Sequence, residues 1–249
     1  MRFENKVVFI TGAGGYIGGE TAYMFGQEGA RVAVCDINQA TVDKTVRRIQ
    51  QAGGTAMGVV ADVTNSASVD SAVARTVERF GRLDVMVHVA GGSARKKSHP
   101  LIEQTDDVIQ EVIGINLFGA IYASRAAAKA MVAQGQGGRI INFSSIVAEN
   151  GLRGCVDYAA AKGGVISMTR SLAKELAPYK ITVNSVAPGL VQRPEETYDV
   201  VNTNFLGEKC TAADVGHVVL FLASSEAHFI TGQTYAIDGG RGLAMKGSD

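Results

Sequence analysis

Seven short runs rich in valine and isoleucine recur along the chain, and no other feature restricts its fold as strongly. These runs span residues 6–11, 30–36, 55–61, 83–90, 138–144, 180–187 and 233–238. Their apolar residues are continuous rather than alternating, which is typical of strands buried on both faces of a parallel sheet. Between the runs, apolar residues recur with helical spacing over residues 39–52, 66–80, 106–133, 158–177 and 212–223. Strands that alternate with helices predict an α/β fold in which seven parallel strands form one doubly wound sheet.

The chain has the length of one large domain of this kind. Its 249 residues contain no repeat, no low-complexity segment and no proline- or serine-rich linker. We therefore predict a single domain over residues 1–249. Asn65 or Ser66, and Thr211, are expected to cap helices because each stands at the start of a helical segment.

The charged residues and cysteines argue against several classes of function. Lysine plus arginine and aspartate plus glutamate each number 24, so no basic excess favours a nucleic-acid or anionic-membrane partner. The three cysteines, an odd number without a CxxC pair, predict neither a disulfide framework nor a zinc site. No apolar run approaches the ~18 to 20 residues of a membrane helix, and an apolar strand begins too early for a signal peptide. We expect a cytoplasmic protein that binds a small molecule and no metal.

A glycine-rich turn, TGAGGYIGGE, follows the first predicted strand. Glycines let the backbone approach a phosphate closely, and the helix that follows offers unpaired N–H groups and a partial positive charge. Asp36 ends the second strand 24 positions after Gly12, near the offset of ~20 for an acid that binds ribose hydroxyls. An ordinary tight turn and a surface aspartate are the alternative. The order of strand, glycines, helix and acid favours a Rossmann-type dinucleotide site.

Asp36 also predicts which dinucleotide binds. Its carboxylate can accept a hydrogen bond from a ribose 2′-OH but would face the 2′-phosphate of NADP. None of Gly15, Ile37 and Asn38 supplies a compensating cation. Two like charges ~4 Å apart repel by roughly 4 kcal/mol at an effective dielectric constant of ~20. We therefore predict NAD as the cofactor.

The segment DYAAAKGG places Tyr158 and Lys162 four residues apart with only alanines between them. On a helix the two side chains would share one face. An ammonium group beside a phenol stabilises the phenolate, which lowers the tyrosine pKa from about 10 toward the range in which a general acid or base works. The pair therefore indicates proton transfer.

With these motifs the sequence resembles the short, single-domain branch of the short-chain dehydrogenase/reductase family along nearly its whole length. The motifs occur in the family's order: TGAGGYIG, ADV at 61–63, VAGG at 89–92, Asn116 in INLFG, Ser145 in NFSSIV, YAAAK at 158–162 and PGLV at 188–191. The resemblance implies an NAD(P)-dependent oxidoreductase that transfers a hydride between nicotinamide and a secondary alcohol or ketone. It also implies a symmetric homotetramer.

The resemblance further implies roles for individual residues. Tyr158 would exchange a proton with the substrate oxygen, and Lys162 would lower the pKa of Tyr158 and hold the nicotinamide ribose. Ser145 would hydrogen-bond the reacting oxygen, and Asn116 would support a water that leads to Lys162. The residues implied to contact the cofactor are Gly12, Gly14, Gly15, Tyr16, Ile17, Gly18, Asp36, Ile37, Asp62, Val63, His88, Ala90, Gly91, Tyr158, Lys162, Pro188, Gly189 and Val191.

Two positions depart from the family's common pattern. Tyr16 stands where the TGxxxGxG loop has its middle glycine, so the spacing here is the TGxxGxxG of the branch with a longer C-terminal substrate domain. The usual NNAG after the fourth strand is replaced by HVAG, which begins at His88. A histidine that finishes a buried strand is more often a satisfied structural group than a catalytic one.

Two other functions stay open. One is a 3-oxoacyl-thioester reductase of the same family, although Asp36 disfavours the NADPH that biosynthetic reduction usually uses. The other is a non-catalytic dinucleotide sensor, which would need neither Ser145 nor Tyr158. The substrate is expected to lie under a lid formed by residues 192–210, and basic loop residues could make it an anion, with solvated surface charges as the alternative: Arg95, Lys96, Lys97, Arg153 and Arg193.

Overall fold

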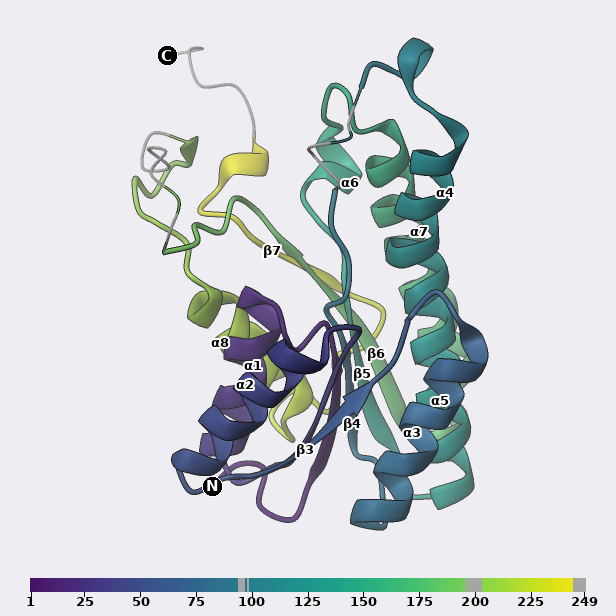
Figure 1. The fold of residues 1–249 in the computed structure, drawn as a ribbon, viewed down its shortest axis with the longest axis vertical. Helices are drawn as coiled ribbons and strands as arrows, with labels where there is room; N and C mark the ends of the chain where they lie inside the picture. Colours follow the sequence, from purple (N-terminus) through teal and green to yellow (C-terminus); the bar gives the residue numbers. More distant parts are fainter. Residues whose placement is uncertain (94–96, 98, 195, 197–202, 244–249) are drawn as a thin grey trace.

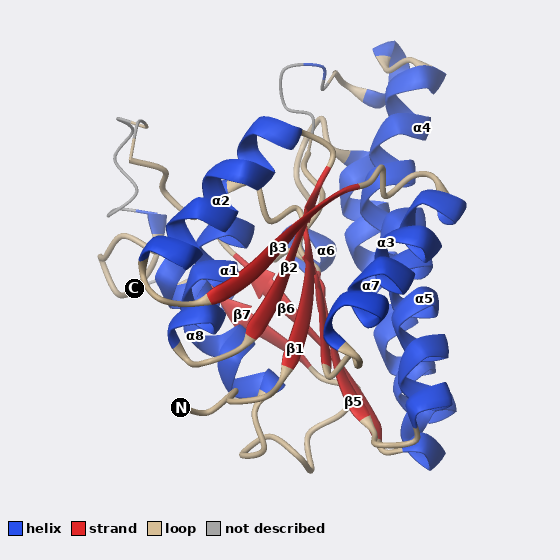
Figure 2. Cartoon of the chain, turned by 60° about the horizontal axis from the view of Figure 1, so that its bottom comes forward, coloured by secondary structure: helices blue, strands red, loops and turns tan. Residues whose placement is uncertain are grey.

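The structure of the protein, a computed structural model, describes residues 1–93, 97, 99–194, 196 and 203–243. Within these residues seven parallel strands form one sheet in the order β3-β2-β1-β4-β5-β6-β7 (Figure 1, Figure 2). The strands are β1 (Val7–Thr11), β2 (Arg31–Asp36), β3 (Thr55–Val60), β4 (Val85–His88), β5 (Gly138–Phe143), β6 (Ile181–Pro188) and β7 (Thr234–Ile237). Each overlaps one predicted apolar run, and the predicted doubly wound sheet is confirmed.

Helices cover both faces of the sheet (Figure 1). One layer holds α1 (Tyr16–Gln27), α2 (Gln39–Gln51) and α8 (Ala212–Ala223), and the other holds α3 (Ser66–Phe80), α5 (Gly119–Gln134) and α7 (Val156–Leu176). Helix α4 (Asp106–Ile113) packs against α7, and the short helix α6 (Val147–Asn150) comes just before α7 in the chain. Successive strand residues point to opposite faces. Val8 and Ile10 therefore pack into one core, and Val7 and Phe9 into the other.

Two helices begin at residues that the sequence singled out. Asn65, rather than Ser66, caps α3, because its side chain accepts a hydrogen bond of 3.1 Å from the backbone N–H of Ser68. Thr211 caps α8 in a reciprocal arrangement with Asp214. These two caps fix where α3 and α8 begin.

The helix predicted over residues 106–133 is wrong in one respect, because it is not continuous. Helix α4 ends at Ile113, a π-helical turn spans Gly114–Phe118, and α5 begins at Gly119. A π-helix has one residue more between its hydrogen-bonded groups than an α-helix, and such turns are frequent at functional sites. Asn116 lies in this turn and is fully buried.

The strand order reverses at the boundary between β1 and β4. In open α/β sheets, ligands bind in the crevice outside the carboxyl ends of the strands at such a point. The loops that follow β1, β4, β5 and β6 all contribute to one cavity there. Across the part of the chain that the structure describes, no helix is long and apolar enough to span a bilayer.

Candidate active site

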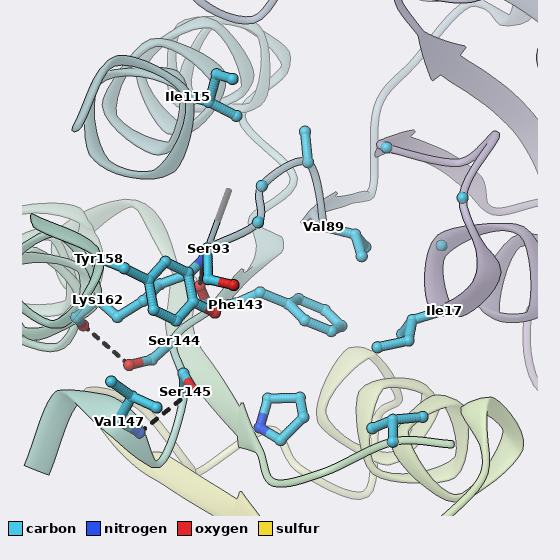
Figure 3. A pocket seen from close by; sticks show the side chains of 18 of the residues that line it. Ile17, Val89, Ser93, Ile115, Phe143, Ser144, Ser145, Val147, Tyr158 and Lys162 are labelled. Carbon is cyan, nitrogen blue, oxygen red and sulfur yellow. Dashed lines mark hydrogen bonds between the residues drawn. The ribbon is translucent and has the colours of Figure 1, made fainter. Parts of the chain in front are cut away.

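A cavity of about 1530 Å³ lies at this edge of the sheet. Its lining residues within 12–115 come from the loops after β1 to β4, the start of α1, α4 and the π-helical turn, and those within 143–242 come from the loops after β5 to β7 and from α7. We call these the N-terminal half and the C-terminal half of the cavity. Figure 3 shows Tyr158, Lys162 and Ser145 gathered on one side of the cavity and Ile17 on the other.

The glycine-rich turn leaves no space for side chains at two positions of the N-terminal half. Gly12 has a φ of +66°, and a Cβ atom there would lie 2.6 Å from the backbone nitrogen of Ala90. A Cβ atom on Gly18 would overlap the carbonyl group of Gly12. Tyr16 is the first residue of α1 and lines the cavity, so its side chain is accommodated. Helix α1 has no side-chain N-cap, which leaves its first N–H groups suited to a pyrophosphate.

Asp36 is held in a fixed orientation in the same half. One carboxylate oxygen accepts a hydrogen bond of 3.0 Å from the Gly14 N–H, and the other accepts one of 3.2 Å from the Asn38 N–H. In the described part of the chain, the basic side chains that line the cavity are Lys162, Arg193 and Arg241. All three belong to the C-terminal half, so the surroundings of Asp36 fit a ribose with free hydroxyls better than one with a phosphate.

Tyr158, Lys162 and Ser145 form a polar cluster in the C-terminal half. The Lys162 Nζ atom lies 5.7 Å from the centroid of the Tyr158 ring and donates a hydrogen bond of 2.7 Å to the Phe143 carbonyl. Lys162 is 3% exposed, and this burial lowers the pKa of its ammonium group to about 7. The Ser145 Oγ atom accepts a hydrogen bond of 3.3 Å from the Val147 N–H, which leaves its own proton to donate.

The two neighbouring serines have different surroundings. The Ser144 hydroxyl donates a hydrogen bond of 2.9 Å to the backbone carbonyl of Lys162, which ties β5 to α7 (Figure 3). Ser145 is the serine expected from its spacing to Tyr158, and it lines the cavity with its hydroxyl turned to the Val147 N–H. Ser144 therefore has a structural partner, whereas Ser145 can offer a proton to a substrate oxygen.

Asn116 reaches the site through the backbone of the β4 loop. Its Nδ2 atom donates to the carbonyls of Gly92 (2.9 Å) and Val112 (2.8 Å), and its Oδ1 atom accepts from the Gly92 N–H at 3.0 Å. A Cβ atom on Gly91 would lie 2.5 Å from this Oδ1 and 3.3 Å from the Lys162 Nζ. The side chains of Asn116 and Lys162 therefore both approach Gly91.

Most of the residues singled out from the sequence line this one cavity. They are Gly12, Gly15, Tyr16, Ile17, Gly18, Asp36, Ile37, Asp62, Val63, Ala90, Gly91, Ser145, Tyr158, Lys162, Pro188, Gly189 and Val191. Gly14, His88 and Asn116, although described by the structure, do not line it. His88 is fully buried, and its contact with the cofactor stays a prediction.

The basic residues proposed to hold an anion have different positions. Arg193 lines the cavity, Lys97 pairs with Glu111 at 2.6 Å, and the described residue Arg153 is not part of the lining. Arg95 and Lys96 lie outside the described residues, as do residues 195 and 197–202 of the predicted lid.

Sequence reasoning missed Arg241, which lines the cavity from the short 3₁₀-helix Arg241–Leu243. The signal that could have found it is its position just after the last strand, because loops at the carboxyl ends of parallel strands share one edge of the sheet.

Comparisons with known proteins identify the family of the chain. A family model described as enoyl-(acyl carrier protein) reductase matches residues 12–241. The short-chain reductase protein NovJ of Streptomyces niveus is 37% identical, with 96% of this chain and 94% of that protein covered. The 3-oxoacyl-(acyl-carrier-protein) reductase FabG of Thermotoga maritima is also 37% identical, with 96% and 99% covered.

The fold comparison leads to the same family. The crystal structure of carveol dehydrogenase from Mycobacterium avium in complex with NAD superimposes with a TM-score of 0.92 at 29% identity, over 98% of this chain and 99% of that chain. The glycine turn, the fixed Asp36 carboxylate and the polar cluster around Tyr158 lie in one cavity. The chain therefore belongs to the short-chain dehydrogenase/reductase family, and it is an oxidoreductase that acts on CH–OH groups with a nicotinamide cofactor.

Proposed function

We propose that the protein is an NAD-dependent dehydrogenase or reductase that interconverts a secondary alcohol and its ketone, with Tyr158 as the general acid and base. The observation that carries this proposal is the arrangement of Ser145, Tyr158 and Lys162 in the same cavity as Asp36. When bound, the nicotinamide supplies the hydride acceptor or donor. The protein then has to move one proton and stabilise charge on one oxygen.

Each residue of the cluster has a task in that proton transfer. The phenolate oxygen of Tyr158 takes the proton of the substrate alcohol during oxidation, and the protonated hydroxyl gives it to the carbonyl oxygen during reduction. The Lys162 cation favours the phenolate form of Tyr158. The Ser145 hydroxyl donates a hydrogen bond to the substrate oxygen as negative charge develops on it. Asn116 keeps Gly92 and the adjoining wall of the cavity in place through its three hydrogen bonds.

NAD rather than NADP is the proposed cofactor because Asp36 stands with its carboxylate fixed in the half of the cavity that has no basic lining residue in the described chain. The test is to incubate the purified protein with NAD and a panel of secondary alcohols and to follow NADH absorbance. Turnover of at least one alcohol is expected. A protein that binds NADH but turns over no alcohol or ketone would be a dinucleotide sensor instead.

A 3-oxoacyl-thioester reductase is the second candidate, and the 37% identity to FabG favours it. The same assay run in reverse, with an acetoacetyl thioester and either NADH or NADPH, separates the two candidates. Faster turnover of the thioester than of any simple ketone would select the second one.

The substrate is proposed to carry an anionic group. Arg193 and Arg241 both line the C-terminal half of the cavity, on loops that follow β6 and β7. Arginine can hold a carboxylate or phosphate with two parallel hydrogen bonds. Glu196 lines the same region, but its carboxylate accepts a hydrogen bond of 3.0 Å from the Arg193 N–H, so it is engaged by the backbone.

The assembly is proposed to be a homotetramer. Phe118 is 47% exposed and Ile121 is 37% exposed at the start of α5, and Phe118 stacks on Tyr122 with ring centroids 6.4 Å apart. Exposed apolar groups on a helix that carries many alanines suit close packing against a second copy of that helix. Light scattering at micromolar concentration is expected to give four times the mass of the chain, and a monomer would contradict the proposal.

A further inference from the structure

A row of buried polar side chains crosses the sheet near the cavity. Thr11, His88, Asn142 and Ser185 are in register on β1, β4, β5 and β6, and each is at most 1% exposed. In-register residues of parallel strands point to the same face, which here is the face covered by α3, α5 and α7. Polar groups buried in this way need partners. His88 is the ionisable member of this row.

The partner of His88 on the β1 side is the hydroxyl of Thr11. The Ala90 N–H points to the Thr11 Oγ1 at 3.4 Å, and this Oγ1 lies 2.9 Å from the His88 Nδ1. The threonine hydroxyl can accept from Ala90 and still donate its proton to Nδ1. In the tautomer in which it does so, the neutral ring carries its proton on Nε2. Burial, with the charge of Lys162 as a smaller cause, lowers the pKa of His88 to about 3, so the ring stays neutral at physiological pH.

On its other side the ring of His88 lies against the π-helical turn. A Cβ atom on Gly119, the residue that follows the turn, would lie 3.4 Å from the His88 Cε1. The backbone of Ile115, within the turn, interacts with the ring in a way that raises its pKa. A group that raises the pKa of an imidazole is a hydrogen-bond acceptor, so the Ile115 carbonyl is the group involved. The contact falls short of full hydrogen-bond geometry, since Nε2 has no ordinary partner among the described residues.

We propose that His88 is a positioning residue for the reaction, because its imidazole links the end of β1 to the π-helical turn and thereby holds Asn116 against Gly92. The ring lies between Thr11, at the end of β1, and Gly119, which follows the π-helical turn. It does not line the cavity. The inference rests on the proposed function only in taking Asn116 as part of the active site.

The main test compares two substitutions in the full-length protein. His88→Leu introduces an apolar side chain of similar bulk and removes both ring nitrogens. We expect kcat to fall about tenfold or more, the scale seen when a group that orients a functional residue is removed. The dissociation constant for NADH, measured by fluorescence titration, should stay within about threefold. His88→Asn restores a hydrogen-bonding side chain, and its kcat should recover to within about threefold of the wild-type value.

Ser185→Ala is the matched control. Ser185 is as deeply buried as His88 and belongs to the same row. Its hydroxyl, however, is hydrogen-bonded at 2.6 Å to Thr234 on the edge strand β7, away from the π-helical turn. Its loss should lower the melting temperature and leave kcat unchanged. A fall in kcat for Ser185→Ala as large as that for His88→Leu would reduce His88 to an ordinary part of the packed sheet and overturn the proposal.

A double-mutant cycle tests the link to Asn116 itself. If His88 acts through Asn116, the double variant His88→Leu, Asn116→Ala should lose at most about threefold in kcat beyond Asn116→Ala alone. The loss of melting temperature should be less than additive for the same pair, and additive when Ser185→Ala replaces His88→Leu. Effects that multiply in kcat and add in melting temperature would show that the two residues act independently.

The tautomer can be measured in the wild-type protein without any substitution in the site. The ring nitrogens of the four histidines are observed by NMR after ¹⁵N labelling, and the signals lost in His88→Asn identify His88. A neutral ring protonated on Nε2 is expected at mildly acid pH. A ring protonated on Nδ1, or a charged ring, would overturn the proposal even if His88→Leu does not fold. Because this measurement and the melting-temperature cycle need no turnover, failure of the proposed function leaves them decisive.

Discussion

The ammonium nitrogen of Lys162 lies 5.7 Å from the centroid of the Tyr158 ring and donates a hydrogen bond of 2.7 Å to the Phe143 carbonyl. Tyr158 and Lys162 are one turn apart on α7, whereas Phe143 ends β5. The lysine is therefore held by the sheet and by the helix at once. A cation restrained from two sides stays beside the phenol through the reaction. The glycine turn lies in the other half of the cavity, so a change to the Tyr158 hydroxyl should affect proton transfer more than cofactor binding.

Tyr158→Phe is expected to lower kcat by about 10² or more, the usual scale of a general acid or base. NADH binding should be nearly unchanged, because the ring remains and only the hydroxyl is lost. Steady-state kinetics and fluorescence titration measure the two quantities. Tyr179→Phe is the control, since Tyr179 ends the 3₁₀-helix Ala177–Tyr179 that follows α7 and is half exposed. Retention of a tenth of wild-type activity by Tyr158→Phe would exclude the proton-transfer role.

Lys162 should make the stability of the cofactor-free protein depend on pH. Burial lowers its pKa from 10.5 to about 7, so between these values the unfolded chain binds a proton that the folded protein does not. The free energy of unfolding therefore rises with pH across this window, by up to about 1.4 kcal/mol per pH unit, and the cost of burying the cation is fully present below it.

Urea unfolding of wild-type protein and Lys162→Met at several pH values isolates this contribution. The difference in unfolding free energy between the two proteins should shift in favour of the wild type as pH rises from 7 toward 10.5. Groups that do not interact with Lys162 titrate alike in both proteins and cancel, and carrying out the comparison in the Tyr158→Phe background removes the titration of Tyr158. A difference that is constant over the window would mean that the lysine titrates normally.

Asp36→Ala should narrow the preference for NAD over NADP. In the wild type we expect kcat/KM to favour NAD by about a hundredfold or more. The carboxylate repels the 2′-phosphate by roughly 4 kcal/mol, and a repulsion reduced by solvent screening to about 2.7 kcal/mol still gives this ratio. Asp43→Ala on the surface of α2 removes an equal charge nearby, where the carboxylate bonds only Gln39 among the contacts that the structure gives, and should leave the ratio unchanged. Equal efficiency with both cofactors in the wild type would defeat the electrostatic argument.

An anionic substrate should be recognised through Arg193 and Arg241. Matched secondary alcohols with and without a carboxylate are compared at several salt concentrations in wild type, Arg193→Ala and Arg241→Ala. The acid should be preferred at low salt, and the preference should weaken as salt rises and fall in at least one variant. Arg153→Ala, a described position outside the cavity lining, should change nothing. Neutral alcohols used as well as the acid by all four proteins would rule out an anion site.

The sheet could be predicted from the sequence because each strand carries its own signal. Runs such as VVFIT in β1 and RVAVCD in β2 are continuously apolar, and only a strand covered on both faces accounts for such runs between helices. The glycine turn could be predicted for a similar reason, since Gly12 and Gly18 have no space for a Cβ atom. Local constraints of this kind are visible in one dimension.

The π-helical turn and Arg241 could not be predicted in that way. The apolar residues on either side of Asn116 keep a helical spacing, so nothing in the pattern marks the extra residue in the turn. Arg241 comes to the cavity because β7 pairs with β6 at the edge of the sheet, which is a long-range property. The direction of the His88 ring likewise depends on Thr11, 77 positions away.

The two halves of the cavity have separate origins along the gene. Residues 12–115 build the half with the glycine turn and Asp36, and residues 143–242 build the half around Tyr158 and the basic loops. Recombination within α5 would exchange one half without cutting through the other. Hybrid proteins joined at this helix are therefore expected to take their cofactor preference from the parent that supplies Asp36 and their substrate preference from the parent that supplies residues 143–242.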